Sequence, residues 1–397
     1  MERLHIAFFG PVNSGKSTLV NAICGQEVSL VSEVPGTTTD PVRKTVELPG
    51  LGPCVLIDTA GLDDTGVLGP ERMRRTLAIL DEADVAVLVE MAGPTGHDVI
   101  PHLTCHDVIP DLISNNVIPD LIGDLEKTGI PVVVYRRGES VASLLERIAA
   151  VRPSEEERFL TGDLVKAGDC VLLVMPQDSE APKGRLILPQ VQVLRELLDR
   201  GCNPICATPA SLPDALSSLK ENPSLVITDS QVFKLVSDSI PAAVPLTSFS
   251  ILLAGEKGNL QVFMEGAGAI DSLKPGDRVL IAEACTHVPD TEDIGRVKIP
   301  ALLRQRMADQ VGHDVSPGLT GSLTIDIAAG NDFPEDLSPY SLIIHCGACV
   351  ATRTLVQRRI KKALRAGVPI TNYGIALAYL QGVLERVVIP QTPLQSS

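Results

Sequence analysis

The stretch from Leu4 to Cys24 allows few ways of folding. Leu4 to Phe9 is an apolar run that predicts a buried strand, and a helical pattern continues through Cys24. The residues between them form a glycine-rich turn with the spacing of a phosphate-binding P-loop. A strand, such a turn and a helix in succession predict an α/β domain. The candidate phosphate-site residues are Gly10, Asn13, Ser14, Gly15, Lys16, Ser17 and Thr18.

The chemistry of this turn follows from its residue types. Backbone N–H groups at a helix N-terminus cradle phosphates, and Lys16 reaches the β- and γ-phosphates. Ser17 supplies a hydroxyl ligand to Mg²⁺. Farther along, the strand Val55 to Ile57 ends in Asp58-Thr59-Ala60-Gly61. There Asp58 can hold Mg²⁺ through water, and the amide of Gly61 can sense a γ-phosphate.

Between these two motifs lies Pro35-Gly36-Thr37-Thr38-Thr39-Asp40, a polar loop suited to a nucleotide switch. The three motifs together resemble the translation-factor-related GTPases of the Era and TrmE type. The resemblance implies GTP as the nucleotide and Thr38 as the switch threonine. It also implies K⁺ coordination by Asn13, as in the potassium-activated members. The candidate catalytic residues are therefore Lys16, Thr38, Asp58 and Gly61.

The guanine-recognition motif of these GTPases is missing. They carry Asn-Lys-x-Asp after a strand, whereas the strand Ile130 to Val134 runs into Tyr135-Arg136-Arg137-Gly138-Glu139-Ser140. No carboxylate there has the spacing that would accept from the guanine edge. We therefore expect nucleotide binding to depend on phosphates more than on the base, and hydrolysis of GTP stays open. The alternative is a decayed nucleotide site that only shapes the domain.

The region from His97 to Thr247 carries weaker signals outside the motifs above. His97 to Pro101 recurs at His106 to Pro110, and this nine-residue period indicates a local duplication in a surface insertion rather than a metal-binding tract. A polar boundary is predicted at Pro153 to Glu157. Short strands and helices then alternate from Asp169 to Thr247, which predicts a small parallel sheet. The polar loop from Val174 to Arg185 is predicted to be a subunit contact, with a substrate lid as the alternative.

Two cysteine-containing segments follow predicted strands in the last third. The apolar run Asp277 to Ala284 ends in Cys285-Thr286-His287, and Ser341 to Ile344 ends in His345-Cys346-Gly347-Ala348-Cys349. Ligands of open α/β sheets bind beyond the carboxyl ends of strands. A helix is predicted from Val350 to Ala366, which would place Cys349 at or near its N-terminus, where thiolate is favoured.

These segments predict a metal site formed by Cys285, Cys346 and Cys349, with His287 and His345 as further candidates. Thiolate-rich ligation suits zinc or an iron–sulfur cluster, and the spacing alone does not separate them. A redox pair and simple packing of buried cysteines are the alternatives. The helix after Cys349 is basic, which indicates a solvated face or a docking surface for an acidic partner.

Charge and composition exclude several classes of protein. The chain has 397 residues, a net charge of −15 and a pI near 4.9, which argues against binding to nucleic acid or to anionic membranes. No apolar run approaches the length of a membrane span. Nine cysteines in a chain that starts without a signal-peptide pattern indicate reduced thiols and a cytoplasmic location.

The combination of these motifs resembles the HydF family of [FeFe]-hydrogenase maturation GTPases over essentially the whole chain, and residues 178–190 also look like that family. The resemblance implies three α/β domains: a P-loop GTPase domain (1–155), a small parallel-sheet dimerisation domain (163–255) and a doubly wound iron–sulfur domain (258–397). It implies a [4Fe–4S] cluster on Cys285, Cys346 and Cys349, with His287 and His345 near the remaining iron.

The same resemblance implies a scaffold that accepts a transient di-iron precursor and delivers it to apo-[FeFe]-hydrogenase. Radical-SAM maturases would be the upstream partners, and the scaffold would be a homodimer. Two other functions stay open. One is an Era- or TrmE-like GTPase in RNA modification or ribosome assembly with structural zinc. The other is a thiol redox enzyme that uses Cys346 and Cys349.

Overall fold

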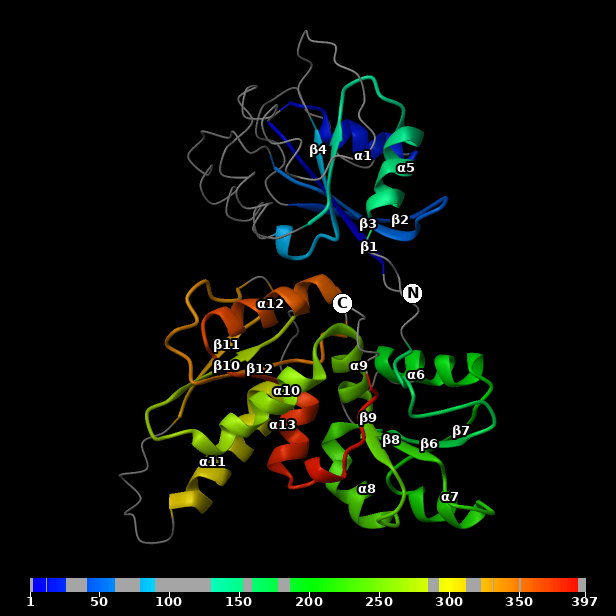
Figure 1. Ribbon diagram of the computed structural model, residues 1–397, viewed down its shortest axis with the longest axis vertical. Helices are drawn as coiled ribbons and strands as arrows, with labels where there is room; N and C mark the ends of the chain where they lie inside the picture. Colours follow the sequence, from blue (N-terminus) through cyan, green and yellow to red (C-terminus); the bar gives the residue numbers. More distant parts are fainter. Residues whose placement is uncertain are drawn as a thin grey trace. The chain divides into compact units, whose positions relative to one another are not determined.

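The computed structural model describes residues 3–11, 13–25, 41–60, 79–89, 130–152, 159–177, 186–284, 293–311, 323–330, 332–349 and 351–391. The chain forms two compact units, residues 1–155 and 156–397. Figure 1 shows their strands and helices. Within the described ranges, no helix combines the length and the apolar character that crossing a bilayer requires.

The first unit is built on a five-stranded sheet with the order β2-β3-β1-β4-β5. β2 is antiparallel to β3, and the other neighbours are parallel. The strands are β1 (Leu4–Phe9), β2 (Val42–Leu48), β3 (Gly52–Asp58), β4 (Val85–Val89) and β5 (Val132–Tyr135). The described helices are α1 (Lys16–Cys24), the short η1 (Ile79–Asp81) and α5 (Val141–Val151).

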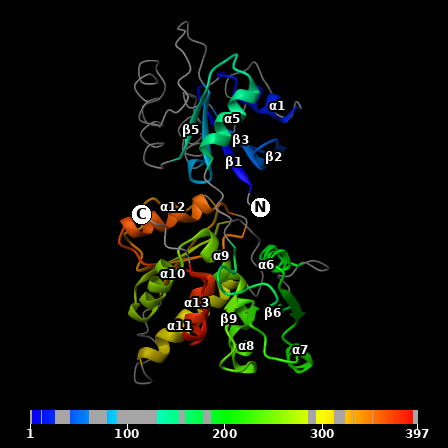
Figure 2. The same cartoon turned by 45° about the vertical axis from the view of Figure 1, so that its right-hand side comes forward.

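Both faces of this sheet carry a hydrophobic core, because neighbouring side chains of a strand point to opposite faces. On one face Ile6 packs in a cluster with Leu19 of α1 and Leu144 of α5. On the other face Ala7 packs in a cluster with Ile79 of η1. The contacting helices α1 and α5 lie on the same side of the sheet (Figure 2).

The second unit contains two four-stranded parallel sheets, with the orders β7-β6-β8-β9 and β11-β10-β12-β13. The strands of the first are β6 (Cys170–Val174), β7 (Asn203–Ala207), β8 (Leu225–Thr228) and β9 (Leu246–Ser248). The strands of the second are β10 (Arg278–Ala282), β11 (Thr324–Ala328), β12 (Leu342–His345) and β13 (Ile370–Asn372). The α-helices are α6 (Leu188–Asp199), α7 (Leu212–Ser218), α8 (Phe233–Ser239), α9 (Phe249–Lys257), α10 (Leu260–Ala267), α11 (Ile299–Val311), α12 (Arg353–Arg365) and α13 (Tyr373–Leu380), with the short η2 (Ser230–Val232), η3 (Gly268–Ser272), η4 (Ile294–Lys298) and η5 (Leu384–Arg386).

The two sheets of this unit are copies of one topology. In each, the first strand pairs with the second on one side and with the third on the other, and the fourth lies outside the third. Lys166 to Asp169 before β6 matches Lys274 to Asp277 before β10. In both turns the glycine has a positive φ, and the Asp side chain accepts from the lysine N–H, at 2.9 and 2.7 Å. Val244 to Gly258 and Val368 to Gly382 share Val, Pro, Thr, Ile, Leu, Ala and Gly at equivalent positions.

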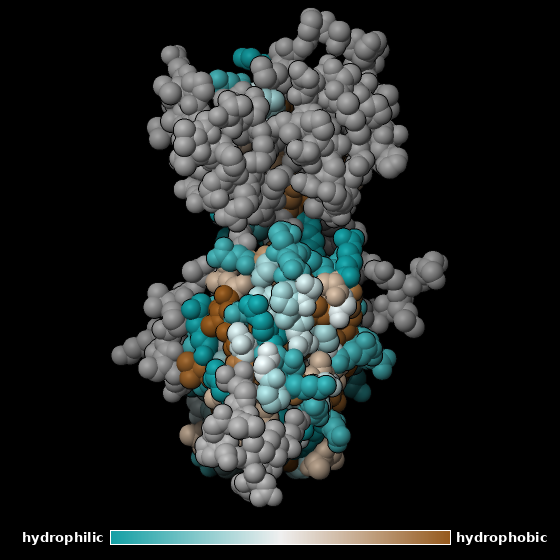
Figure 3. All heavy atoms as spheres, turned by 90° about the vertical axis from the view of Figure 1, so that its left-hand side faces the viewer, coloured by the Kyte–Doolittle hydropathy of each residue, from teal (hydrophilic) through white to brown (hydrophobic). Residues whose placement is uncertain are grey.

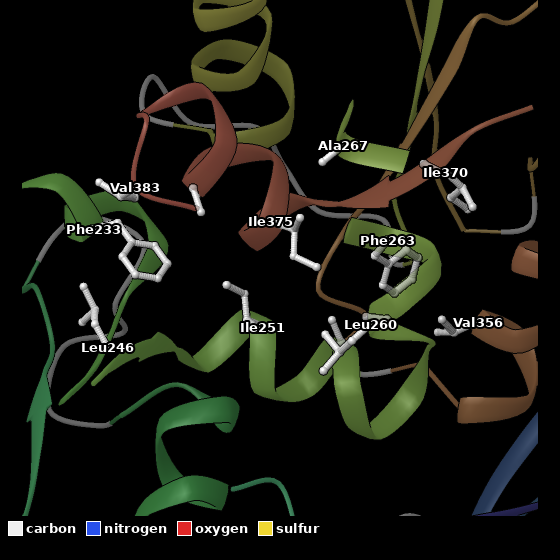
Figure 4. Packing of buried hydrophobic residues seen from close by; sticks show 14 of the residues in the cluster. Phe233, Leu246, Ile251, Leu260, Phe263, Ala267, Val356, Ile370, Ile375 and Val383 are labelled. Carbon is white, nitrogen blue, oxygen red and sulfur yellow. The ribbon is translucent and has the colours of Figure 1, made fainter. Parts of the chain in front are cut away.

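One hydrophobic core joins the two copies. It combines Phe233, Leu246 and Ile251 of the first copy with Ile370 and Ile375 of the second. Figure 4 shows Ile251 and Ile375, which occupy equivalent positions of the repeat, lying opposite each other between α9 and α13. The amide of Asn372 donates to the carbonyl oxygen of Ser250 across the same contact, at 3.5 Å. Unit 2 is therefore a duplicated fold in which like elements pack on each other.

The outer surface of the second unit is mixed in polarity. On the face shown in Figure 3, hydrophobic residues are scattered among hydrophilic ones. Large exposed apolar side chains in this unit include Val297, Ile327 and Leu364, which lie on three different elements.

The predicted α/β class is confirmed, and the strands predicted in all three regions are present within a few residues. The helix predicted from Val350 is wrong at its start. α12 begins at Arg353, because Thr352 caps it by accepting from the N–H of Leu355 at 3.2 Å. The ranges predicted for the second and third domains lie inside one compact unit. The nine-residue repeat (97–122) and the polar boundary (153–157) lie outside the described residues, as do residues 178–185 of the polar loop.

Candidate functional site

The backbone of the phosphate loop has positive φ angles, which glycine adopts without strain. Gly10 has a φ of 151°, and a Cβ there would lie 2.5 Å from the carbonyl oxygen of Val89. Asn13 and Gly15 also have positive φ, at 62° and 95°. Successive turns of this kind direct backbone N–H groups into one concave surface. The Gly15 turn leads directly into α1, so this surface lies at a helix N-terminus.

Lys16 is buried inside this loop. Its Nζ donates to the carbonyl oxygens of Gly10 at 2.9 Å and Pro11 at 2.6 Å, and it lies 3.5 Å from Ser14 Oγ. Ser14 is buried as well, whereas Ser17 is half-buried and Asn13 and Thr18 are exposed. The predicted loop residues are thus gathered at one place, with the lysine cation held by the loop itself.

Asp58 lies at the end of β3, next to this loop. Its backbone pairs with Phe8, two residues before Gly10, and its side chain is buried. The adjacent Thr59 hydroxyl donates to the carbonyl oxygen of Phe8 at 2.6 Å. The strand register therefore places the predicted Mg²⁺ residue at the edge where the loop begins. Thr38 and Gly61 lie outside the described residues.

The segment after β5 is organised around Glu139. Its carboxylate accepts from Arg147 and from the hydroxyl of Ser143, at 3.1 Å for the hydroxyl. Arg147 also donates to the carbonyl oxygen of Val134 at 2.8 Å, which connects α5 to β5. The carboxylate nearest to the expected guanine-recognition position is therefore engaged in holding the loop.

The strands that precede the two cysteine segments, β10 and β12, are neighbours where the second sheet of unit 2 changes winding direction. β10 lies between β11 and β12, so the chain leaves β10 toward one side and reaches β12 on the other. This topological switch point is where doubly wound folds bind ligands. Cys346 directly follows β12, and its N–H donates to Ala282 at the end of β10, at 2.8 Å.

The thiol of Cys346 receives two backbone N–H groups. Its Sγ accepts from Ala284 at 3.1 Å and from Ala348 at 3.4 Å. Ala348 has a φ of 52°, and this turn directs its amide back toward the sulfur. Ala284 precedes Cys285 in the sequence, so the residue before one cysteine segment contacts the sulfur of the other. Cys285 and His287 themselves lie outside the described residues.

His345 is buried, and both nitrogens of its ring have protein partners. Nδ1 lies 2.8 Å from the carbonyl oxygen of Cys346, and Nε2 lies 3.2 Å from Arg359. Burial lowers the pKa of His345 to about 3, and the Arg359 charge acts in the same direction. A neutral imidazole can donate from Nδ1 and accept at Nε2. This geometry suits a residue that holds the cysteine loop better than one that binds a metal.

Arg359 joins the ends of three strands. Its guanidinium donates to the carbonyl oxygen of Glu283 after β10, at 3.3 Å, to that of Gly330 after β11, and to His345 of β12. It also stacks on Phe333, with its carbon 4.9 Å from the ring centre. The interpretation of α12 as a basic, solvated helix is wrong for Arg359, which is only 4% exposed.

Cys349 is half-buried and lies three residues before Thr352, the cap of α12. It therefore lies near the helix N-terminus but before the cap, outside the first turn. Its carbonyl oxygen instead accepts from Lys257 at 3.4 Å.

Buried polar residues also surround the end of β10 at this edge of the sheet. Glu283 is 1% exposed and accepts from Arg296 at 2.8 Å. Gly295 packs so closely against the Tyr373 hydroxyl that a Cβ would lie 1.9 Å from it. Burial raises the pKa of Tyr373 well above its usual value, and the nearby Cys346 and Glu283 add to the effect. Within the described ranges, which omit Cys285 and His287, no three His, Cys, Asp or Glu residues are grouped to hold a metal.

Sequence reasoning missed Lys257, Glu283 and the structural role of Arg359. A signal for Arg359 existed, because it falls on the apolar stripe of α12 with Leu355 and Ile360. Lys257 gave no such signal, since its partners lie more than 90 residues away in the sequence.

Three family models match the chain. Residues 5–109 match a 50S ribosome-binding GTPase, residues 160–258 the hydrogen maturase F dimerization domain, and residues 261–390 the hydrogen maturase F tetramerization domain. The last two correspond to the two copies of the duplicated fold.

Curated relatives match the first unit. The tRNA modification GTPase MnmE of Xylella fastidiosa is 47% identical over 87 residues, which are 22% of this chain and 19% of that protein. The MnmE of Nitrosospira multiformis is 44% identical over 89 residues, covering 22% and 20%. The chain thus spans about a fifth of the length of these relatives.

Similar solved structures include Era in complex with MgGDPNP and 16S ribosomal RNA nucleotides, at 16% identity and a TM-score of 0.26, covering 52% of this chain and 92% of that one. A single-residue variant of Aquifex aeolicus Era matches at 18% identity and a TM-score of 0.24, covering 84% and 97%. A GTPase domain followed by both maturase domains is the architecture of one family. The chain belongs to the hydrogen maturase F family.

Proposed function

We propose that this chain is a scaffold that binds a [4Fe–4S] cluster, carries a di-iron precursor of the hydrogenase active site and uses its GTPase domain as a regulatory switch. The observation that carries this proposal is the environment of Cys346. Its sulfur accepts one amide from the β10 end, next to Cys285, and one from its own loop. The residue before Cys285 therefore contacts the Cys346 sulfur, which supports a shared site for the two cysteine segments.

The residues present fit an iron–sulfur cluster. Clusters are held by thiolates, and hydrogen bonds to the sulfurs are among the factors that set their properties. Cys346 already has two such donors. The site also lies at a topological switch point, where an incoming group can reach it. A bound cluster would supply an anchoring iron for the di-iron cargo.

The protein's own residues then divide the work. Cys285, Cys346 and Cys349 would hold the cluster, while His345 and Arg359 keep the β12 end and its loop in place. Three cysteines leave one iron of four to another ligand, such as His287, water or a small anion. An exchangeable ligand at that position would let the precursor dock and leave.

The first unit would bind GTP with Mg²⁺. Lys16 and the loop amides would contact the phosphates, Ser17 and Asp58 would serve Mg²⁺, and Asn13 would coordinate K⁺. The dimerization and tetramerization families matched by unit 2 support a homo-oligomer, with a dimer as its smallest form. Apo-[FeFe]-hydrogenase would receive the cargo, and radical-SAM maturases would supply it.

The decisive experiment is anaerobic reconstitution followed by iron, sulfide and zinc analysis. The wild-type chain should take up close to four iron and four sulfide, and the single variants Cys285→Ser, Cys346→Ser and Cys349→Ser should each lose most iron–sulfur absorption. Cys206→Ser is the matched control, because Cys206 is exposed on β7 in the other copy of the fold. Full cluster content in Cys285→Ser would contradict the convergence of the two segments. Zinc without sulfide would favour an RNA-modification or ribosome-assembly GTPase instead.

A further inference from the structure

Lys257 connects the two copies of the duplicated fold at the cysteine loop. It is the last residue of α9 and belongs to the first copy, yet its Nζ contacts the second copy, and the residue is only 5% exposed. Nζ donates to the carbonyl oxygens of Ala351 at 2.7 Å, Ala348 at 3.0 Å and Cys349 at 3.4 Å. An ammonium has three N–H donors, and here three acceptors come from one turn.

Two side chains of α12 hold the backbone at the end of α9, where Lys257 lies. Arg353 of α12 donates to the carbonyl oxygen of Glu256 at 2.7 Å. Gln357 of α12 donates to the carbonyl oxygens of Lys257 at 3.1 Å and Gly258 at 2.8 Å. The end of α9 is thus held by α12, and its terminal side chain is directed into the loop that precedes α12.

The duplication supplies an internal comparison. Lys257 in α9 is equivalent to Gln381 after α13, as Gly258 is to Gly382. Gln381 reaches into the opposite copy in the same way, and its amide donates to the carbonyl oxygen of Ser230 at 3.3 Å. Ser230 begins the short helix η2 in the segment after β8, and this segment is equivalent to the cysteine loop after β12. The neutral amide of Gln381 therefore contacts the segment without cysteines, whereas the cation of Lys257 contacts the loop that contains them.

We propose that Lys257 is a positioning residue for the iron–sulfur cluster, which holds the turn bearing Cys346 and Cys349 and raises the reduction potential of the cluster bound there. The inference rests on the proposed cluster site. A cluster held by thiolates becomes more negative on reduction, and net charge and hydrogen bonding near the sulfurs set its potential. A cation excluded from water is screened weakly, so it stabilises the reduced form more than a surface lysine does. Arg359, which is also buried, adds charge of the same sign from the strand side.

Three substitutions separate charge from geometry. Lys257→Gln places in the cysteine loop the residue that the other copy uses, and it removes the charge while keeping an N–H donor. Lys257→Met removes both, and Lys257→Arg keeps the charge. Gln381→Met is the matched control, since it removes the equivalent contact at the loop that has no cysteines.

The experiment is anaerobic reconstitution of the full-length protein with iron and sulfide, followed by iron content and an EPR-monitored redox titration. Lys257→Gln should keep most of its iron but show a more negative midpoint potential, and Lys257→Arg should keep the wild-type potential. Lys257→Met should lose at least half of its iron, with the remainder also shifted negative. Gln381→Met should match wild type in both measurements.

The outcomes separate the two proposals. An unchanged potential in Lys257→Gln would overturn the electrostatic role of Lys257, and wild-type iron content in Lys257→Met would overturn the positioning role, while the cluster itself stood. If wild type bound no iron–sulfur cluster, the proposed function would fail, and this inference with it. If Lys257→Met did not fold, Lys257→Gln and Lys257→Arg would still decide the question through their potentials.

Discussion

Replacing Arg359 should loosen the cysteine-bearing edge of the second unit. We expect Arg359→Met, which keeps an unbranched side chain of similar reach, to remove the donors that join the ends of β10, β11 and β12. Hydrogen bonds from a charged group contribute about 1.5 to 3 kcal/mol when well formed. The bonds to Glu283 and His345 are long, at 3.3 and 3.2 Å. We therefore use a value below this range, roughly 1 kcal/mol, as the average for the three bonds.

The stacking of Arg359 on Phe333 adds about 0.5 kcal/mol. The local free energy of opening should therefore fall by about 3.5 kcal/mol, which corresponds to a roughly 300-fold faster amide exchange. The chain has no tryptophan for fluorescence, so hydrogen exchange with mass spectrometry is the suitable measurement. Peptides from β10 and β12 should lose protection, whereas peptides from β1 and α1 should be unchanged.

Arg365→Met is the control, because Arg365 lies exposed at the end of the same helix. A change below about fivefold in the β10 and β12 peptides would mean that Arg359 carries little of the edge, and the assignment of three useful hydrogen bonds would be wrong. A similar loss of protection in both units would mean that the variant acts through general unfolding. Either result would refute the argument.

Three further predictions concern nucleotide binding, the N-cap of α12 and the fourth iron position of the proposed cluster. Lys16→Ala should weaken binding of GTP and ATP at least tenfold, because Lys16 would contact the phosphates. Wild type should show little preference between the two nucleotides in competition binding, because the Glu139 carboxylate is engaged by Arg147. A strong preference for GTP would mean that another segment recognises the base. Thr352→Ala should destabilise the start of α12 by about 1 kcal/mol, which hydrogen exchange would detect as faster exchange of the amides in its first turn. Thr352→Ser, which keeps the capping hydroxyl, should stay close to wild type. Equal exchange in wild type and both variants would disprove the cap. Imidazole or cyanide should change the EPR spectrum of the reduced cluster without loss of iron, and an unchanged spectrum at saturation would show that the fourth iron position is closed.

Local patterns in the sequence determined the strands, the phosphate loop and the strand-end location of the cysteines. Alternation and apolar runs are properties of neighbouring residues, so β1 and the loop after it were predictable without any knowledge of packing. The same patterns could not place the start of α12. Apolar character continues upstream from the helix, and the cap by Thr352 decides where it begins.

Only the tertiary structure decided how the site is supported. The amide of Ala284 meets the Cys346 sulfur across 62 residues of sequence, and Lys257 meets the cysteine loop across more than 90. Arg359 falls on the apolar stripe of α12, but its partners could not be predicted from that pattern, because they come from three strands that end around it. The physical reason is the same in each case. A buried polar group needs partners, and those partners are supplied by whichever elements packing brings alongside, not by neighbours in the chain.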